Sequence, residues 1–347
     1  MGQLLITGGA GFIGSHTCLK LLQEGHSLLV FDDFSNGSNE ALKRVAELAN
    51  VDIGSQLKIF KGDIRSRRDL DDAFSSLGEK VEAVIHFAGL KAVGESILNP
   101  LNYWDVNVGG SRNLLEGMLR NNCRTIVFSS SATIYGSTQT IPIAENSKIQ
   151  PTNPYGRTKE AIEQLLFDVF SSGSDLRVAC LRYFNPVGAH PSGLIGEAPS
   201  GKPNNLFPFV SQVAVGVQSH LEIFGTDWPT HDGSAIRDYI HVMDLAEGHS
   251  AALKVLQAES SPQLITLNLG SGKGYSVFEV LGCFENFLGK KIPYIVGPRR
   301  PGDVSTSIAD PSLAETILQW KAKRNLEDMC RDALLWQKTN PFGYGKN

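Results

Sequence analysis

The stretch LLITGGAGFIG at residues 4–14 decides the fold of this chain. An aliphatic, β-branched run ends at Thr7, and glycines follow at Gly8, Gly11 and Gly14 before a helical pattern over residues 12–23. Glycine suits such a turn because it adopts positive φ and leaves room for a diphosphate to approach the backbone. Since the N–H groups that open the next helix attract anions, the segment predicts a dinucleotide-binding strand–turn–helix unit.

An acidic residue completes this pattern at the end of the second predicted strand, residues 28–31. Asp32 lies 18 residues beyond Gly14, close to the spacing at which a carboxylate binds the adenosine ribose hydroxyls. Asp33 follows it, and no arginine stands directly after the pair to hold a 2′-phosphate. The sequence therefore favours NAD over NADP as the cofactor.

Apolar runs continue to alternate with helical patterns through the first half of the chain. Strands are expected at residues 57–60, 83–87, 125–129 and 178–183, with helices at 39–49, 70–77, 103–119 and 155–170. Strands that are apolar on both faces and are separated by helices form parallel sheets covered on both sides. We therefore predict an α/β fold with a Rossmann-like, doubly wound parallel sheet in an NAD-binding domain over residues 1–186.

The pattern becomes less regular after Pro186, where proline and glycine are dense up to Pro208. Residues 187–347 are predicted to form a smaller, irregular α/β domain that binds the substrate. One strand-like run, residues 264–269, is expected to return to the first sheet. A length of 347 residues agrees with about two domains of roughly 150 residues each.

The composition excludes several classes of protein. A formal net charge of −4 gives no basic footprint for nucleic acid or an anionic membrane. No apolar run approaches the roughly 18 residues of a membrane-spanning helix, and the first residues lack the pattern of a signal peptide. The five cysteines are scattered and form no CxxC, which is typical of a reducing compartment. We therefore expect a cytoplasmic protein.

The segment NPYGRTK at residues 153–159 places Tyr155 and Lys159 four positions apart, on one face of a helix. The same stripe continues through Ile162, Leu166 and Val169, so it is expected to face the interior. Burying a lysine is costly unless it has a partner, which argues for a functional pair. An ammonium about 4 Å away favours the phenolate by roughly 4 kcal/mol before desolvation, which would bring the tyrosine pKa down from about 10. Tyr155 would then act as a base and Lys159 as its activator.

A serine-rich segment, SSSAT at residues 129–133, follows the fifth predicted strand. The carboxyl ends of the strands line the ligand crevice of a doubly wound sheet, so a hydroxyl here can bond to the reacting oxygen. The same residues suit the cap of a helix, and the sequence leaves both roles open.

A metal site finds little support in the sequence. His241 and His249 flank Asp244 and Glu247, but their spacing matches no zinc pattern. We interpret them as scattered polar residues on a helical face, and we predict no metal.

Eight segments, in order along nearly the whole chain, carry a family resemblance. They read TGGAGFIGSH, HFAGLKAVGES, FSSSATIYG, NPYGRTK, RYFNPVGAH, PNNLFPF, RDYIHVMDLA and PRRPGD. With them the chain resembles the extended short-chain dehydrogenase/reductase family and, within it, the UDP-glucose 4-epimerases. This resemblance implies a tightly bound NAD that is regenerated in each cycle, UDP-glucose and UDP-galactose as substrates, and a homodimer.

The resemblance also implies a role for each matching residue. Tyr155 is the expected base, Lys159 its activator and a ligand of the nicotinamide ribose, and Ser131 the hydroxyl partner. The residues expected to contact NAD are Gly8, Gly11, Phe12, Ile13, Gly14, Asp32, Asn36, Asp63, Ile64, Phe87, Ala88, Gly89, Lys91, Asn107, Tyr155, Lys159 and Tyr183. Those expected to hold the UDP-sugar are Ser131, Ala132, Thr133, Tyr155, Asn185, Asn205, Leu206, Phe224, Arg237, Tyr239, Arg300, Asp303 and Ser307.

The reaction implied by the resemblance oxidises sugar carbon 4, rotates the keto sugar and returns the hydride to its opposite face. Stricter members of the family carry a bulky tyrosine where this chain has Ser307, so the small residue predicts that N-acetylated UDP-sugars are also accepted. One alternative is a sister nucleotide-sugar epimerase or dehydratase, although dehydratases carry Asp-Glu where this chain has Ala132-Thr133. A remote alternative is an NAD-sensing binding protein, a class that usually lacks the tyrosine or the lysine.

Overall fold

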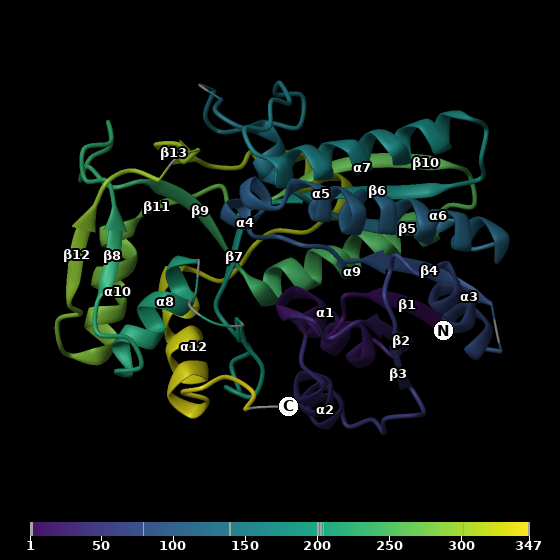
Figure 1. Cartoon of the computed structure of the whole chain (residues 1–347), viewed down its shortest axis with the longest axis horizontal. Helices are drawn as coiled ribbons and strands as arrows, with labels where there is room; N and C mark the ends of the chain where they lie inside the picture. The colour runs from purple at the N-terminus through teal and green to yellow at the C-terminus, as the bar shows by residue number, and fades with distance from the viewer. Residues whose placement is uncertain are drawn as a thin grey trace.

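The computed structural model describes residues 3–78, 80–138, 140–199, 201, 203, 205–300 and 302–345. At its centre lies a parallel sheet with the strand order β10-β6-β5-β4-β1-β2-β3 (Figure 1). Its strands are β1 (Gln3–Thr7), β2 (Ser27–Asp32), β3 (Leu57–Lys61), β4 (Val81–His86), β5 (Thr125–Ser131), β6 (Arg177–Tyr183) and β10 (Gln263–Leu269). The strand order reverses between β1 and β4, which is where doubly wound sheets open a ligand crevice.

Helices cover both faces of this sheet. One face carries α1 (Phe12–Gln23), α2 (Asn39–Ala49), α9 (Val242–Ala258) and α11 (Ser312–Leu318); the other carries α3 (Arg67–Ser76), α6 (Gly110–Arg120) and α7 (Pro154–Ser171). Leu4 and Ile6 of β1 pack into the first layer, whereas Leu5 packs into the second. Burial on both sides explains why the strand sequences are continuously apolar.

The predicted helix over residues 103–119 is part of one continuous helix of irregular geometry. It begins with α5 (Pro100–Tyr103), passes through a π-helical segment, η1 (Trp104–Gly109), and continues as α6; the short α4 (Val93–Leu98) precedes it. Isolated π-helical turns often mark functional positions. Asn107, an expected NAD contact, lies within this segment.

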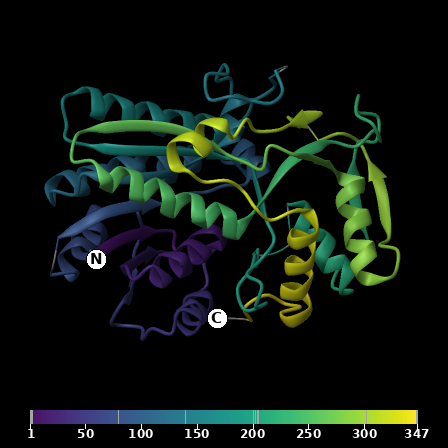
Figure 2. The same cartoon turned by 180° about the vertical axis from the view of Figure 1, so that it is seen from behind.

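The rest of the second half stands beside the carboxyl ends of the central strands, at the left in Figure 1 and at the right in Figure 2. It contains β7 (Asn185–Val187), α8 (Leu206–Ala214), β8 (Leu221–Phe224), β9 (Ile236–His241), β11 (Gly274–Ser276), α10 (Val277–Leu288), β12 (Tyr294–Gly297), β13 (Thr306–Ser307) and α12 (Leu326–Thr339). Strands β11, β9, β13 and β7 form one small sheet, and β12 pairs with β8. Phe207, Phe284 and Met329 belong to the core between α8, α10 and α12.

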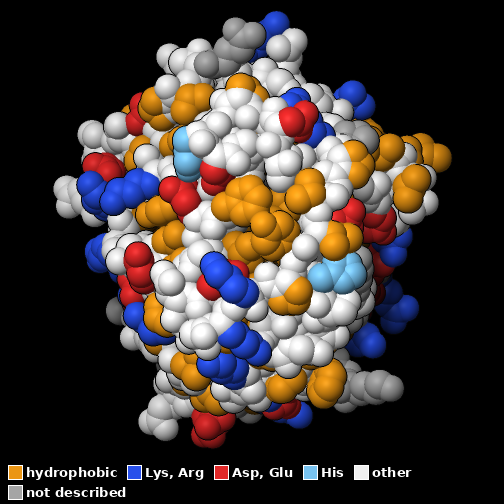
Figure 3. All heavy atoms as spheres, turned by 90° about the vertical axis from the view of Figure 1, so that its left-hand side faces the viewer, with side chains coloured by type: hydrophobic (Ala, Val, Ile, Leu, Met, Phe, Trp, Pro, Cys, Tyr) orange, Lys and Arg blue, Asp and Glu red, His pale blue; other side chains and the backbone are white. Residues whose placement is uncertain are grey.

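One end of the molecule, seen in Figure 3, presents a group of apolar side chains. Strand β12 lies on this side in Figure 1 and leaves Tyr294, Ile295 and Val296 about half exposed. No helix within the described parts of the chain combines the length and the apolarity needed to span a lipid bilayer.

The fold class predicted from the sequence is confirmed. Residues 264–269 do return to the first sheet, as β10 beside β6. Helix α9, from the second half of the chain, also packs against β5 and β6. The boundary expected between residues 186 and 187 falls within β7, and the division into two domains stays a prediction.

Candidate active site

The glycine-rich turn after β1 packs directly against the loop after β4. Gly8 has a φ of +70°, and a Cβ built on it would lie 2.6 Å from the backbone nitrogen of Ala88. A Cβ on Gly14 would collide with the carbonyl oxygen of Gly8. Only glycine therefore permits this close approach, and the turn presents bare backbone at the start of α1. That shape, with no acidic residue in the first turn of α1, suits a diphosphate.

Asp32 holds the glycine turn from the end of β2. Its carboxylate accepts hydrogen bonds from the backbone N–H groups of Ala10 and Phe34, both at 2.9 Å. Burial raises the pKa of Asp32, and these two bonds oppose the rise. Asn36 lies exposed in the following loop. The acid expected from the spacing is therefore beside the glycine turn.

Other expected NAD residues lie at the carboxyl ends of β3, β4 and β6. Asp63 forms an ion pair with Arg65 at 2.6 Å, and Ile64 packs beneath Gly110. The ring of Phe87 lies 4.8 Å from the ring of His249, a residue not expected at the site from the sequence. The full set gathered at this edge of the sheet comprises Gly8, Gly11, Phe12, Ile13, Gly14, Asp32, Asn36, Asp63, Ile64, Phe87, Ala88, Gly89, Lys91 and Tyr183.

Asn107 joins the loop after β4 to α7. Its Oδ1 accepts from the N–H of Leu90 at 2.7 Å, and its Nδ2 donates to the Leu90 carbonyl and to Thr158 Oγ1, both at 3.0 Å. The residue thereby fixes the segment from Gly89 to Lys91 relative to the helix that carries Tyr155.

A carboxylate links Lys91 to the second half of the chain. Glu197 Oε1 accepts from Lys91 Nζ at 3.0 Å and from Asn205 Nδ2 at 3.2 Å. An expected NAD residue and an expected UDP residue thus share one partner. No sequence pattern had singled out Glu197.

Tyr155 and Lys159 lie on the inner face of α7, with exposures of 6% and 4%. Lys159 Nζ donates to the Ser129 carbonyl oxygen at 2.8 Å and lies 4.8 Å from the centre of the Phe128 ring. Burial lowers the pKa of Lys159 to about 8, and the Glu163 carboxylate opposes this. Ile162 and Leu166 on the same stripe are also buried, as predicted.

The electrostatic effect of the lysine on Tyr155 differs from the expectation. Burial raises the pKa of Tyr155, and only the hydrogen bond with the Ser131 hydroxyl opposes this rise. Lys159 Nζ lies 6.0 Å from the centre of the tyrosine ring because it is turned toward Ser129. Lys159 alone therefore does not bring the pKa of Tyr155 down.

Ser131 takes the helix-cap role that the sequence left open for the serine-rich segment, and its bond to the reacting oxygen stays a prediction. It bonds to Tyr155, as just described, and it caps the 3₁₀ helix η2 (Ala132–Tyr135) by accepting from the Thr133 N–H at 3.2 Å. Ala132 and Thr133 therefore lie directly beside the tyrosine's hydrogen-bonding partner.

The buried ion pair between Arg182 and Glu163, near Lys159, was not predicted from the sequence. Arg182 of β6 binds Glu163 through both carboxylate oxygens, at 2.6 to 3.2 Å, and Ser130 Oγ donates to the same carboxylate. Arg182 also donates to the Tyr135 hydroxyl at 3.0 Å. Glu163 lies four residues after Lys159, as Lys159 lies four residues after Tyr155. This spacing is the sequence feature from which Glu163 could have been predicted.

Four of the expected UDP residues form one connected group. Asp303 pairs with Arg300 at 3.1 Å and with Arg237 at 3.8 Å, and the Arg300 guanidinium lies 4.7 Å above the Phe224 ring. Ser307 of β13 pairs in register with Arg237 of β9.

The remaining expected substrate residues lie on neighbouring elements. Tyr239 is buried, with its ring 5.3 Å from that of Phe207. Asn205 and Leu206 lie at the start of α8, and Asn185 is exposed at the start of β7.

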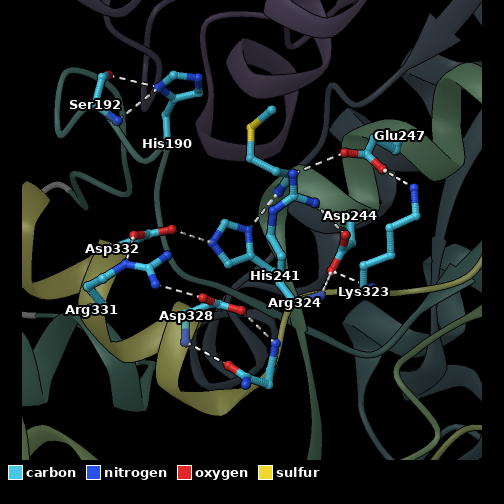
Figure 4. Close-up of polar contacts among 12 residues, drawn as sticks. His190, Ser192, His241, Asp244, Glu247, Lys323, Arg324, Asp328, Arg331 and Asp332 are labelled. Atoms are coloured by element: carbon cyan, nitrogen blue, oxygen red, sulfur yellow. Dashed lines mark hydrogen bonds and ion pairs between the residues drawn. The ribbon is translucent and has the colours of Figure 1, made fainter.

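The histidines and acids near residues 241–249 do not form the polar helix face that the sequence suggested. His241, Asp244 and His249 are fully buried and have separate partners. Figure 4 shows those of His241 and Asp244. His241 Nε2 meets Asp332 at 3.2 Å, Asp244 pairs with Arg324, and His249 Nε2 meets Ser129 Oγ at 2.8 Å. Within the described residues, no group of three such side chains is arranged to hold a metal ion.

Together, the doubly wound sheet, the glycine turn and the Tyr155–Lys159 pair define an extended short-chain dehydrogenase/reductase. The chain belongs to the NAD dependent epimerase/dehydratase family, whose model matches residues 4–270.

Three relatives are similar over nearly the whole chain. The UDP-glucose 4-epimerase of Bacillus subtilis (strain 168) is 51% identical over 342 residues, covering 98% of each chain. The structure of UDP-glucose 4-epimerase from Bifidobacterium longum in complex with NAD+ and UDP is similar with a TM-score of 0.93 and 44% identity, over 98% of this chain and 99% of that one. The UDP-Glc/GlcNAc 4-epimerase from Campylobacter jejuni gives a TM-score of 0.82 and 35% identity, over 98% and 100%.

Proposed function

We propose that this enzyme interconverts UDP-glucose and UDP-galactose by transient oxidation at sugar carbon 4. The observation that carries the proposal is the buried Tyr155–Lys159 pair, which stands at the same edge of the sheet as the glycine turn. High identity to a UDP-glucose 4-epimerase over 98% of the chain supports the same activity.

The residues at the glycine turn fit NAD. Bare backbone at Gly8 and Gly14 accommodates a diphosphate, and the Asp32 carboxylate suits ribose hydroxyls. When bound, NAD supplies the hydride acceptor and later the donor at sugar carbon 4, together with a positive ring that favours the phenolate.

Tyr155 is the proposed base. Its oxygen takes the proton of the carbon-4 hydroxyl as the sugar becomes a ketone, and returns it when the ketone is reduced on its other face. The Ser131 hydroxyl holds the phenol in place and favours its ionised form. Lys159, anchored on the Ser129 carbonyl, keeps a positive charge at a buried position.

The Arg237–Asp303–Arg300–Phe224 group is the proposed UDP site. Guanidinium groups bind diphosphate oxygens, a carboxylate binds ribose hydroxyls, and an aromatic ring suits a base. Firm contacts here hold the nucleotide while the keto sugar rotates about its diphosphate link. Binding energy from the unreactive nucleotide thus retains the intermediate.

The proposed activity is tested with purified protein, UDP-galactose and no added NAD. UDP-glucose should form, and denaturing the protein should release about one NAD per chain. Tyr155→Phe should keep its NAD and lose turnover. Turnover in that variant, or a wild-type chain without nicotinamide, would refute the proposal, and a keto-sugar product seen by UV absorbance would indicate a dehydratase instead.

Ser307 supports a wider range of substrates, UDP-N-acetylglucosamine and UDP-N-acetylgalactosamine. Its side chain is small and partly exposed, and it lies in register with Arg237 of the proposed UDP site. A small residue there leaves space for an N-acetyl group on the sugar. The similar Campylobacter jejuni protein is named for both kinds of sugar.

An apolar surface supports a homodimer. Ile97, Leu98, Leu101 and Trp104 on α4, α5 and η1 are exposed, two of them to 79% and 83%, and Phe167 is exposed on the neighbouring α7. Contiguous exposed apolar residues of this kind mark protein interfaces. Leu101→Glu should convert a dimer to a monomer in sedimentation, and a wild-type monomer would contradict the assignment.

We place the enzyme in the cytoplasm. All five cysteines are free in the structure, and four of them are buried, which agrees with a reducing compartment.

A further inference from the structure

We propose that Asp238, a buried acid between Arg237 and Tyr239, is a positioning residue that aims both of these side chains at the nucleotide. The inference rests on the proposed function, because Arg237 and Tyr239 are assigned there to the UDP-sugar. It adds a residue that does not touch the substrate but sets the direction of those that do.

Four donors converge on the Asp238 carboxylate, which is fully buried. Oδ1 accepts from the backbone N–H and the hydroxyl of Ser271, at 2.8 and 2.7 Å. Oδ2 accepts from the backbone N–H groups of Gly272 and Ala309, at 2.9 and 3.1 Å. Every bond is made to an acceptor oxygen, so the ionised carboxylate is the form that satisfies all four donors.

Side chains alternate between the two faces of strand β9, so anchoring Asp238 also orients its neighbours Arg237 and Tyr239. Successive side chains of a strand point to opposite faces, so Arg237 and Tyr239 share the face opposite to Asp238. A carboxylate fixed on one face prevents the strand from turning about its axis. Asp238 thereby holds the other face, with Arg237 and Tyr239, in a constant orientation.

The same carboxylate also connects β9 to two other parts of the site. Ser271 and Gly272 follow β10, the edge strand of the central sheet. Helix α7, which carries Tyr155 and Lys159, packs against β5 and β6 of the same sheet. Ala309 lies two residues after Ser307 on β13. Gly270 completes the contact, because a Cβ built there would lie 2.6 Å from Asp238 Oδ2. Asp238 therefore sets the position of the UDP residues relative to the central sheet.

The electrostatics of Asp238 agree with a residue retained for its geometry. Burial raises the pKa of its carboxyl to about 6, although all four hydrogen bonds act in the opposite direction. The ionised acid is thus costly to bury, and the four hydrogen bonds offset part of that cost.

Asp238→Asn tests the inference with the NAD-loaded enzyme. The amide keeps the shape of the acid but has one acceptor oxygen, and its NH₂ group faces donors. UDP binding by calorimetry should weaken by about tenfold or more, and the KM for UDP-galactose should rise in parallel. NAD content should stay unchanged, and kcat at saturating substrate should fall by less than about threefold, because the catalytic pair is intact.

Asp244→Asn is the matched control. Asp244 is also a fully buried acid, and it accepts from the backbone N–H groups of Lys323 and Arg324 at 3.2 and 3.0 Å (Figure 4). Its hydrogen bonds lead to the segment before α12 and to no expected UDP residue. This variant should lower the melting temperature while its UDP affinity stays within about twofold of wild type.

A milder variant, Ser271→Ala, removes one of the four hydrogen bonds and should weaken UDP binding by about threefold. This variant provides the test if Asp238→Asn does not fold.

A folded Asp238→Asn enzyme that binds UDP as tightly as wild type would overturn the inference. Equal weakening in the Asp244 control would overturn it too, since general destabilisation would then explain the loss. Wild-type protein that binds no UDP would instead refute the proposed function.

Discussion

Lys159 donates its 2.8 Å hydrogen bond to the backbone carbonyl of Ser129, not to the phenol of Tyr155. The three serines at the end of β5 thereby serve three residues of α7 that are spaced by four. Ser129 holds Lys159 through its carbonyl, Ser131 bonds to Tyr155, and Ser130 donates to Glu163. The orientation of Tyr155 and Lys159, the proposed catalytic pair, is thus a property of the strand as much as of the helix.

Glu163→Gln should shift the pH dependence of catalysis. The Glu163 carboxylate opposes the lowering of the Lys159 pKa by burial, so its removal lets the ammonium lose its proton at lower pH. The alkaline limb of the kcat profile should move down by about one pH unit, while kcat near pH 6.5 changes less.

Glu160→Gln, one turn before Glu163 in α7, should leave the profile in place, because Glu160 is not among the groups that shift the pKa of Lys159. If the Glu163 variant lost activity by the same factor at every pH, the acid would serve only the folding of the site.

Three fully buried histidines should make the protein sensitive to mild acid. Burial lowers the pKa of His16 and His86 to about 3 and that of His249 to about 4. Their folded pKa values lie below the unfolded value near 6.5, so the stability they allow is present above that pH and is lost as the pH falls toward their folded values. At pH 5 the loss is about 2 kcal/mol for each histidine.

Urea unfolding at several pH values measures this loss. His86→Asn, at a site between the hydroxyls of Thr7 and Ser111, should reduce the slope of stability against pH between 6.5 and 5. His220→Asn, at an exposed site with no carboxylate partner among the described residues, is the control variant. An unaltered slope in the His86 variant would contradict the assignment.

Gly14→Ala should impair both folding and NAD retention. The new methyl group would collide with the Gly8 carbonyl, which costs about 1–3 kcal/mol if the turn shifts and changes the cradle for the diphosphate. Gly282→Ala is the control, because no atom lies within 4 Å of a Cβ at that helical position, and it should stabilise the chain by about 1 kcal/mol. Equal NAD content in the two variants would show that the turn does not hold the cofactor.

Ser307→Tyr should separate the two kinds of substrate. A bulky ring in register with Arg237 fills the space of an N-acetyl group, so activity on UDP-N-acetylglucosamine should fall by about a hundredfold while activity on UDP-galactose stays within a few fold. Coupled assays on both sugars measure the ratio. An equal loss on both would mean that position 307 does not select the sugar.

The central sheet was predictable because its inner strands, such as β1 and β5, are buried on both faces, and because Gly8 and Gly14 have a steric reason in the turn. Asp32 and the Tyr155–Lys159 stripe were found for the same reason, since spacing along a strand or helix is a local property. The helix at residues 103–119 was found without its π-helical middle, which no local pattern indicated.

The residues that were missed act through contacts between distant segments. Glu163 is paired with Arg182 from another strand, and Asp238 is anchored by Ser271 and Ala309. Sequence spacing carries no information about such partners. The Lys159 direction was missed for a related reason: its acceptor is a backbone carbonyl, which every residue possesses.

The central sheet cannot be completed until strand β10 has been synthesised. This strand is the outer neighbour of β6, yet 79 residues separate the end of β6 from its start. A nascent chain that has emerged only through β6 exposes the apolar margin of an unfinished sheet, open to association with other chains. We therefore expect a fragment that stops near residue 186 to aggregate during expression, and the nucleotide-binding half to mature only once the ribosome has passed Leu269.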